Sequence, residues 1–294
     1  MGRGAGWYEG DESGCNRMKA AWKQVLEAPK GAAERVGRAA CGVWRGTAES
    51  MEFAGRLAVA GWRTVLGKGM RTRLPDFGVI FSRAGAEAVP VTMLVGFLLG
   101  FIIAYMSAAM LRQFGAEIYV ANLIGLSLVK ELGTIVAAIV LAARSASAFA
   151  AEIGTMAVND EIAAMRTMGI DPVRYLALPR IAAGALALPL LSLFADVAGL
   201  FGGYVTLSLF GYSAKVFLAN AFAFCKAADL WTSLAKGVVF GAAIAAAGCR
   251  CGLATGVGSD AVGKSTTAAV VTSLVLFIAL DGLFALAMSA AGGG

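Results

Sequence analysis

The amino-acid sequence predicts an all-α membrane protein with about five transmembrane helices, an N-terminal interfacial amphipathic helix and a short helix between two spans. Three observations lead to this fold class. Of the 294 residues, 59% are hydrophobic, and the mean hydropathy is +0.74. Only 15% are charged, against about 25% in a typical soluble domain. Five apolar segments are each long enough, or nearly long enough, to cross a bilayer.

The N-terminal region, residues 1–75, is basic, whereas residues 76–294 hold the apolar segments of the predicted transmembrane domain. Residues 1–87 contain 14 of the 25 Lys and Arg, and the chain opens without the apolar core of a secretory signal. Acidic residues are interspersed there, which favours a role at the membrane surface over nucleic-acid binding. Residues 45–67 place charged and apolar side chains on opposite sides of a helical wheel, so we expect an interfacial helix with Trp62 at headgroup depth. An amphipathic helix packed on a soluble core is the alternative.

The apolar segments follow in order along the rest of the chain. We expect spans at about Ala88–Leu111, Leu123–Ala151, Ile181–Phe210, Trp231–Cys249 and Ala268–Ala291. The first contains Pro90, Gly96 and Gly100, so a bent pair of half-helices is an alternative there.

The distribution of positive charge predicts how these spans are oriented. With the N-terminus inside, the inner loops hold 19 Lys and Arg and the outer loops hold three. Loops rich in Lys and Arg stay on the cytoplasmic side. We therefore expect a cytoplasmic N-terminus, a C-terminus on the outer side, and the segment between the second and third spans in the cytoplasm.

That cytoplasmic segment has the pattern of a short helix of about three turns, at about residues 158–168. Asn159 and Asp160 can accept hydrogen bonds from the backbone N–H groups that open a helix. Gly169 and Pro172 end it. The apolar stripe between them consists of Ile162, Met165 and Met168. Methionine is adaptable and common at interaction surfaces, so this helix could bind a soluble partner, and a solvated loop helix is the alternative.

Charged residues also occur within the apolar segments, namely Lys130, Glu131, Arg144, Asp196, Lys236 and Asp281. Each costs about 3 kcal/mol at the bilayer centre unless it is paired or hydrated. They predict a polar cavity or proton path, or ion pairs of Lys236 with Glu131 or Asp281 that only fix helix packing. Histidine is absent and the five cysteines form no metal-binding pattern, so we expect no metal site.

One short stretch matches a nucleotide-binding pattern. Gly258–Ser265 satisfies G-x-x-x-x-G-K-S. A phosphate-binding loop needs a preceding strand and a following helix in an α/β domain, but here apolar spans flank the motif. We therefore expect no ATP binding by this chain.

Three stretches resemble the MlaE/YrbE family of ABC-transporter permeases: Leu128–Gly154, Glu152–Arg180 and Gly256–Met288. The similarity extends from about Phe77 to Met288. It implies a non-catalytic permease subunit that moves phospholipids between the inner and outer membranes and serves outer-membrane lipid asymmetry. A homodimer in the bacterial inner membrane is implied, with an ATPase subunit that binds ATP and Mg, an MCE-domain protein on the outer side, and room for a small accessory cytoplasmic subunit. We expect no cofactor in this chain.

The resemblance also implies three sets of functional residues. The helix that couples to the ATPase would involve Glu152, Gly154, Thr155, Met156, Asn159, Asp160, Glu161, Met165, Gly169, Asp171 and Pro172. The intramembrane polar set is Lys130, Glu131, Asp229, Lys236 and Asp281. Lipid would contact an apolar stripe near the outer end of the first span and its neighbour, formed by Ile103, Met106, Met110, Leu111, Phe114 and Leu132. Many relatives have Glu-Gln near the start of the coupling helix where this chain has Asp160-Glu161-Ile162.

Two alternatives belong to other classes of membrane protein. A proton-coupled secondary transporter would use the intramembrane carboxylates and need no ATPase, but it often shows two related halves, and we find no internal repeat. A non-transporting membrane scaffold would not need so many charges inside the bilayer.

Overall fold

The computed structural model describes residues 55, 74–223 and 225–291, and all of these except Gly55 belong to one compact unit, Arg56–Gly294. Apart from Gly55, the interfacial helix predicted at residues 45–67 lies outside the described residues, and the division at residue 75 stays a prediction. Every regular element among the described residues is helical, which confirms the all-α membrane fold class.

Five stretches of helix are long and apolar enough to cross a membrane, as the sequence predicted. They are Phe77–Phe114, Tyr119–Val158, Val173–Leu209, Ala227–Leu253 and Ser259–Ala290. Each begins earlier than its predicted segment, because hydropathy marks only the part in contact with lipid, whereas the hydrogen-bonded helix continues beyond it.

The first stretch contains α2 (Leu74–Ala84), the 3₁₀ turn η2 (Ala86–Ala88), α3 (Val89–Leu111) and the 3₁₀ turn η3 (Arg112–Phe114). Pro90 lies in the first turn of α3, where a backbone N–H would have no partner within the helix. The helix then runs for 23 residues without a break. The bent pair of half-helices is therefore not formed within residues 89–111.

Glycines in α3 allow it to pack closely against α8 (Leu178–Leu209). A Cβ on Gly96 would lie 2.7 Å from the carbonyl oxygen of Ala195, and one on Gly100 would overlap the carbonyl of Gly199. Small residues at such spacings let the backbones of membrane helices approach each other. Gly96 and Gly100, which weakened the prediction of a span, thus serve helix packing.

The second stretch is built from α4 (Tyr119–Ser127), η4 (Leu128–Leu132), α5 (Gly133–Val140), η5 (Leu141–Ala146) and α6 (Ser147–Val158), with η4 and η5 wound as π-helix. In each π segment two consecutive side chains bond to neighbouring helices. Glu131 follows Lys130, and both pair with residues of α10 (Ala227–Leu253). Single π turns are frequent at functional sites, and the sequence did not predict either one.

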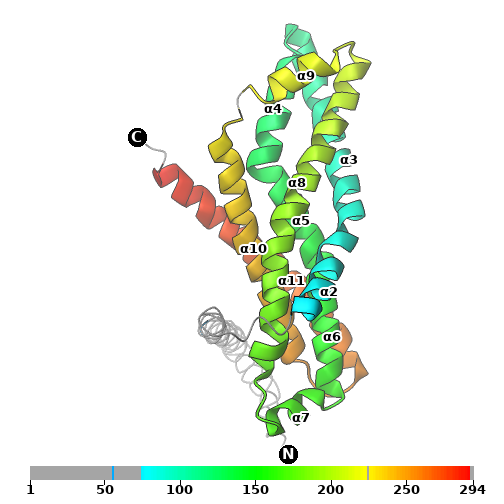
Figure 1. Ribbon diagram of the computed structural model, residues 1–294. Coiled ribbons are helices and arrows are strands. Elements are labelled where there is room, and N and C mark those ends of the chain that lie inside the picture. The colour runs from blue at the N-terminus through cyan, green and yellow to red at the C-terminus, as the bar shows by residue number, and fades with distance from the viewer. Residues whose placement is uncertain (1–54, 56–73, 224, 292–294) are drawn as a thin grey trace, which may run out of the picture. The chain divides into compact units, whose positions relative to one another are not determined.

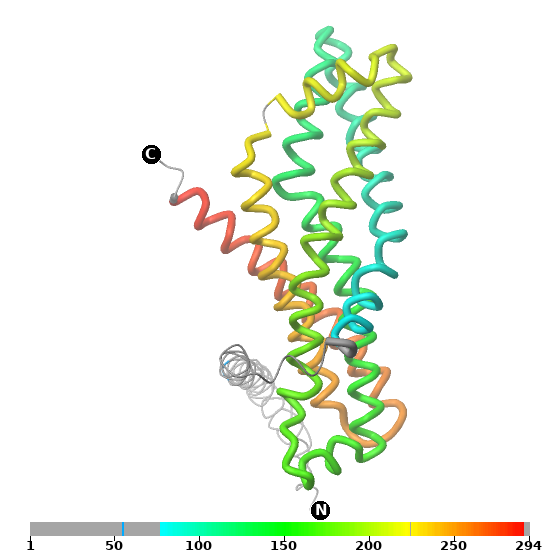
Figure 2. Tube along the Cα trace, in the orientation of Figure 1, coloured from blue at the N-terminus to red at the C-terminus, as the bar shows by residue number. Residues whose placement is uncertain are grey.

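The remaining elements are α7 (Glu161–Thr167), the π segment η6 (Val173–Ala177), α9 (Ala214–Ala221) and α11 (Ser259–Ala291). Figures 1 and 2 show α7 at one end of the long helices and α9 at the other, with the C-terminal part of α11 diverging from α10. Two clusters of buried apolar side chains fill the interior. One surrounds Leu188 and Phe240, and the other surrounds Ile124 and Phe217.

Candidate functional site

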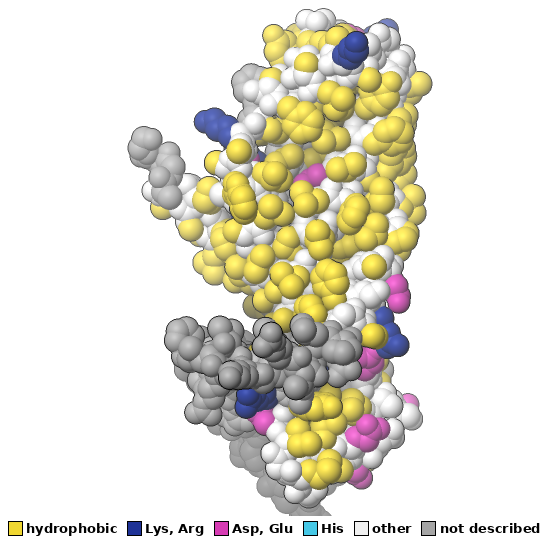
Figure 3. All heavy atoms as spheres, viewed as in Figure 1, with side chains coloured by type: hydrophobic (Ala, Val, Ile, Leu, Met, Phe, Trp, Pro, Cys, Tyr) yellow, Lys and Arg dark blue, Asp and Glu magenta, His cyan; other side chains and the backbone are white. Residues whose placement is uncertain are grey.

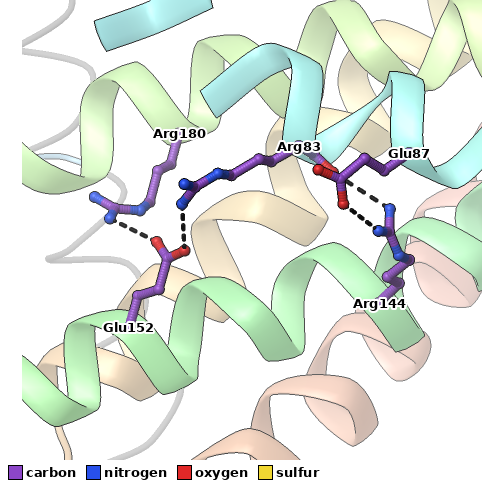
Figure 4. Close-up of polar contacts among 5 residues, drawn as sticks. All are labelled: Arg83, Glu87, Arg144, Glu152 and Arg180. Atoms are coloured by element: carbon purple, nitrogen blue, oxygen red, sulfur yellow. Dashed lines mark hydrogen bonds and ion pairs between the residues drawn. The ribbon is translucent and has the colours of Figure 1, made fainter. Parts of the chain in front are cut away.

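Charged side chains from three of the spans meet in a group that we call the boundary cluster. It consists of Arg83, Glu87, Arg144, Glu152 and Arg180 (Figure 4). The guanidinium of Arg144 donates to Glu87 at 2.6 Å, and that of Arg180 donates to Glu152 at 2.8 Å. Arg83 approaches the same Glu152 carboxylate to 3.8 Å.

The boundary cluster marks one edge of the apolar layer. The 23 uncharged residues of α3 begin two positions after Glu87. At a rise of 1.5 Å per residue they extend about 35 Å, close to the hydrocarbon thickness of about 30 Å. In Figure 3, most side chains on the visible surface above a group of Lys, Arg, Asp and Glu side chains are apolar, which agrees with this limit.

The span that contains α6 continues well past this edge. Val158 lies 14 residues beyond Arg144, which corresponds to about 20 Å of helix. The helix α7 that follows is therefore held clear of the apolar layer. This is where a soluble partner could reach it.

The start of α7 differs from the prediction. The backbone N–H of Asn159 bonds to Thr155, so this residue ends α6, and Asp160 takes a left-handed conformation with φ 57°. The prediction that these side chains cap α7 was wrong. Asn159 belongs to the end of α6, and the Asp160 carboxylate accepts no hydrogen bond from the first turn of α7. The helix has seven residues, about two turns rather than about three.

The end of α7 confirms the predicted stop. Gly169 has φ +75°, and the N–H of Ile170 bonds to the carbonyl of Met165 at 2.9 Å, an arrangement in which a left-handed glycine satisfies the last carbonyls of a helix. Asp171 then forms an Asx turn before the next segment, because its Oδ1 accepts the N–H of Val173 at 3.1 Å. With Pro172 buried, Gly169, Asp171 and Pro172 shape this turn.

The predicted apolar stripe of α7 crosses from the interior to the surface. Ile162 is buried, Met165 is half-buried and Met168 is 66% exposed. Glu161 is exposed as well. A partner would therefore meet Met168 and its neighbours.

The other residues assigned to coupling lie further up α6. Gly154 packs closely on the turn between α10 and α11, since a Cβ there would lie 2.8 Å from the Oγ1 of Thr255. Thr155 donates to the carbonyl of Ala151 at 2.8 Å, and Met156 is half-buried. The structure thus divides the residues assigned to coupling into three groups. The residues of α7 and its ends form a tip, Gly154 and its neighbours on α6 form a support against the turn between α10 and α11, and Glu152 belongs to the boundary cluster.

The stretch that matches the nucleotide-binding pattern is part of this support. Gly258 turns the chain with φ +99°, and Ser259–Ser265 form the first turns of α11. Beyond the first turn, backbone N–H groups of a helix bond within it and cannot converge on a phosphate. Ser265 is buried and lies against the Gly154 position.

A second group of polar side chains joins the second span to α10, and we call it the polar seam. Lys130 lies 3.5 Å from Asp229, the hydroxyls of Thr134 and Ser233 are hydrogen-bonded at 2.8 Å, and Lys236 donates to Glu131 at 2.6 Å. Lys236 also contacts Asp281 of α11 at 3.5 Å. Both predicted pairs of Lys236 are confirmed.

The sequence did not predict the contacts of Lys130 with Asp229 and of Thr134 with Ser233. Lys130 and Thr134 are four residues apart on one helix, as are Asp229 and Ser233 on the other, so each helix presents its two polar side chains on one face. That spacing could have predicted the seam. Lys236 is buried, but the side chains of Lys130 and Glu131 are 47% and 44% exposed on the single chain.

The six residues of the expected lipid stripe divide into two groups. Met106, Met110 and Phe114 are exposed by 64%, 69% and 82%. They recur every four residues and form an exposed apolar strip along the α9 end of α3 and η3. The other three, Ile103, Leu111 and Leu132, pack against the buried cluster around Ile124.

Comparison with known proteins identifies the family. The family described as Permease MlaE matches residues 80–287. The chain belongs to the MlaE permease family. A probable ABC transporter permease of Rickettsia typhi is 35% identical over 66% of this chain and 75% of its own, and one of Synechocystis is 38% identical over 65% and 73%. The chloroplastic protein TRIGALACTOSYLDIACYLGLYCEROL 1 of Arabidopsis thaliana is 34% identical over 67% of this chain and 57% of its own.

One buried acid in this MlaE permease stands apart from the polar seam. Asp196 of α8 is 5% exposed, and its Oδ1 has no hydrogen-bond partner among the described residues. It faces Gly133 so closely that a Cβ there would lie 2.6 Å from its Cγ. The sequence flagged Asp196 only as an intramembrane charge, and nothing in the pattern pointed to Gly133.

Proposed function

We propose that this MlaE-family permease is the transmembrane subunit of an ABC transporter that moves phospholipids between the inner and outer membranes. A separate ATPase subunit would bind ATP and Mg and drive it. The observation that carries the proposal is α7, an exposed amphipathic helix that follows a span continuing 14 residues, about 20 Å of helix, past Arg144. A solvated loop helix would not need the support that α6 receives from the turn between α10 and α11 through Gly154.

Two observations support a lipid as the cargo. Met106, Met110 and Phe114 give α3 a flexible apolar strip at the end opposite α7, and long, adaptable side chains suit acyl chains. The name of the Arabidopsis relative refers to a galactolipid.

A homodimer is supported by the exposure of the polar seam. Lys130 and Glu131 lie 14 and 13 residues from Arg144 along the span, well inside the apolar layer. Half-exposed charges at that depth cost about 3 kcal/mol each if they face lipid. A second copy, or a water-filled cavity between two copies, would remove that cost.

The proposed location is the bacterial inner membrane, with α7 in the cytoplasm and the C-terminus in the periplasm. Five spans leave the two ends of the transmembrane domain on opposite sides of the membrane. An MCE-domain protein would then meet the α9 end of the helices. A small accessory subunit would belong on the cytoplasmic side.

In the proposed mechanism, closure of the ATPase moves α7 and thereby α6. The movement passes to α8 through the ion pair of Glu152 with Arg180, and to α10 through the polar seam. Nucleotide shifts the permease only as far as the complex prefers one arrangement over the other.

The test is co-purification of the tagged chain from native membranes, with mass spectrometry of bound proteins and lipids, followed by reconstitution. We expect an ATPase, an MCE-domain protein and phospholipid to accompany the chain, and lipid transfer to stop with vanadate. Transfer that persists with vanadate but follows a proton gradient would instead establish the proton-coupled secondary transporter.

A further inference from the structure

A cavity of about 340 Å³ opens within the boundary cluster. All five charged side chains of the cluster line it, from α2 and η2, the second span and α8 (Figure 4). Apolar side chains, among them Ile80 and Phe149, complete the lining. The cavity is thus lined by both charged and apolar side chains.

The cluster carries more positive charge and more hydrogen-bond donors than its own acids use. Three arginines face two glutamates, which leaves a net charge of +1. Arg83 is 66% exposed and reaches Glu152 only at 3.8 Å. Figure 4 shows the guanidinium groups of Arg83 and Arg180 converging on the Glu152 carboxylate.

Arg180 carries a hydrogen-bond donor at the cavity that no described residue satisfies. The residue is only 9% exposed. Its Nη1 donates to the carbonyl of Leu176 and its Nη2 donates to Glu152, but its Nε is buried without a hydrogen-bond partner among the described residues. Buried donors are almost always paired in folded proteins. This N–H lacks an acceptor among the described residues, and a ligand oxygen that entered the cavity would supply one.

The depth of the cavity and its lining restrict the ligand. The boundary cluster lies at the edge of the apolar layer, where phospholipid headgroups are found. A guanidinium group matches the geometry of phosphate oxygens better than any other side chain. We propose that this cavity binds the phosphate of a phospholipid in the leaflet on the α7 side, with Arg83 and Arg180 donating hydrogen bonds to it. The proposal requires only that the chain spans a membrane, and it holds whether or not the chain transports lipid.

The test is native mass spectrometry of the delipidated full chain titrated with dioleoylphosphatidylglycerol. Removing the exposed arginine with Arg83→Gln should raise the dissociation constant of the tightest-bound lipid about fivefold, the loss expected for one partly screened charge-assisted bond. Arg112→Gln is the matched control, because Arg112 is 69% exposed and lies 3.8 Å from Glu117 at the other end of the helices. It should change that constant less than about twofold.

A second variant predicts the opposite sign. Glu87→Gln removes the carboxylate that holds Arg144 and raises the net charge of the cavity to +2. The side chain of Glu87 is 57% exposed, so the fold should tolerate the change. Lipid should then bind at least about twofold more tightly, whereas a cluster that only holds helices together would bind it no better.

The titration is repeated with excess inorganic phosphate. The proposal is supported if Arg83→Gln weakens lipid binding, Glu87→Gln strengthens it and free phosphate does not displace the lipid. It is overturned if Arg83→Gln and Arg112→Gln behave alike, or if Glu87→Gln fails to strengthen binding. Displacement of lipid by free phosphate would identify a site for the free anion and overturn the lipid assignment.

Discussion

The contact between α3 and α8 predicts the effect of a single methyl group. In Gly100→Ala, the new Cβ would overlap the carbonyl of Gly199 and lie 2.6 Å from its carbonyl carbon. The atoms that the new Cβ would meet are the backbone O, C and Cα of Gly199, so no side chain can rotate away to make room. We expect α3 and α8 to separate, because a carbon atom and a carbonyl carbon need roughly 3.5 Å between them.

The cost follows from two opposing effects. Overpacking of a tight contact costs about 1–3 kcal/mol, and the rigid backbone contact places Gly100→Ala at or above the upper value. Replacing glycine by alanine inside a helix returns about 1 kcal/mol. The net destabilisation is about 2 kcal/mol or more, which lowers the melting temperature of a domain of this size by about 4–8 °C.

The assay is thermal unfolding of the purified chain in detergent. Gly263→Ala is the matched control, since Gly263 is also inside a helix, α11, but a Cβ there would meet nothing within 4 Å. It should stabilise the chain by about 0.5–1 kcal/mol. Equal melting temperatures for Gly100→Ala and the wild type would refute the proposed tight packing of α3 on α8.

Three further predictions concern the polar seam, α7 and the α9 end. Lys236→Met should lower the free energy of unfolding by about 3 kcal/mol, because it leaves the carboxylates of Glu131 and Asp281 without their cation. Neutralising the nearer carboxylate, Glu131, in the same chain should recover part of this loss. A melting curve identical to that of the wild type would contradict the pairing. Met168→Asp should weaken retention of the ATPase in pull-downs about tenfold. Val257→Asp changes an exposed apolar residue outside α7 and should not weaken it; equal retention by the two variants would count against α7 as the contact. The hydrogen bond from Tyr212 to Glu117 raises the pKa of the phenol above its ordinary value of 10.0. The contribution of this hydrogen bond to stability is therefore present at neutral pH and lost as pH rises through the raised pKa. Ultraviolet titration should show the Tyr212 phenol ionising at a lower pH in Glu117→Gln than in the wild type.

The spans were predictable because an apolar run of about 20 residues is rarely found outside a membrane-crossing helix. The stop at Gly169 and the pairs of Lys236 were predictable too, since each follows from one residue type in one setting. The start of α7 was not. Asp160 is a good cap in isolation, but the sharp turn after α6 places it in the left-handed region, where its carboxylate caps no N–H of the helix it precedes.

The boundary cluster was out of reach of the sequence for a different reason. Arg83 and Glu87 precede the first predicted span, and Arg180 precedes the third, so the sequence placed all three in loops. Only the fold brings them next to Arg144 and Glu152. The π turns were equally hidden, because no residue in Leu128–Leu132 or Leu141–Ala146 is a helix breaker.

The second span has a mechanical consequence that follows from its continuity. It is one continuous helical stretch from Tyr119 to Val158, and Arg144 forms an ion pair with Glu87. Lys130 lies 14 residues on one side of Arg144 and Val158 lies 14 residues on the other. If the span moves as a rigid body about this ion pair, it acts as a lever with arms of about 20 Å on each side. A sideways displacement of the α7 end would then reach Lys130 with the same size and the opposite direction.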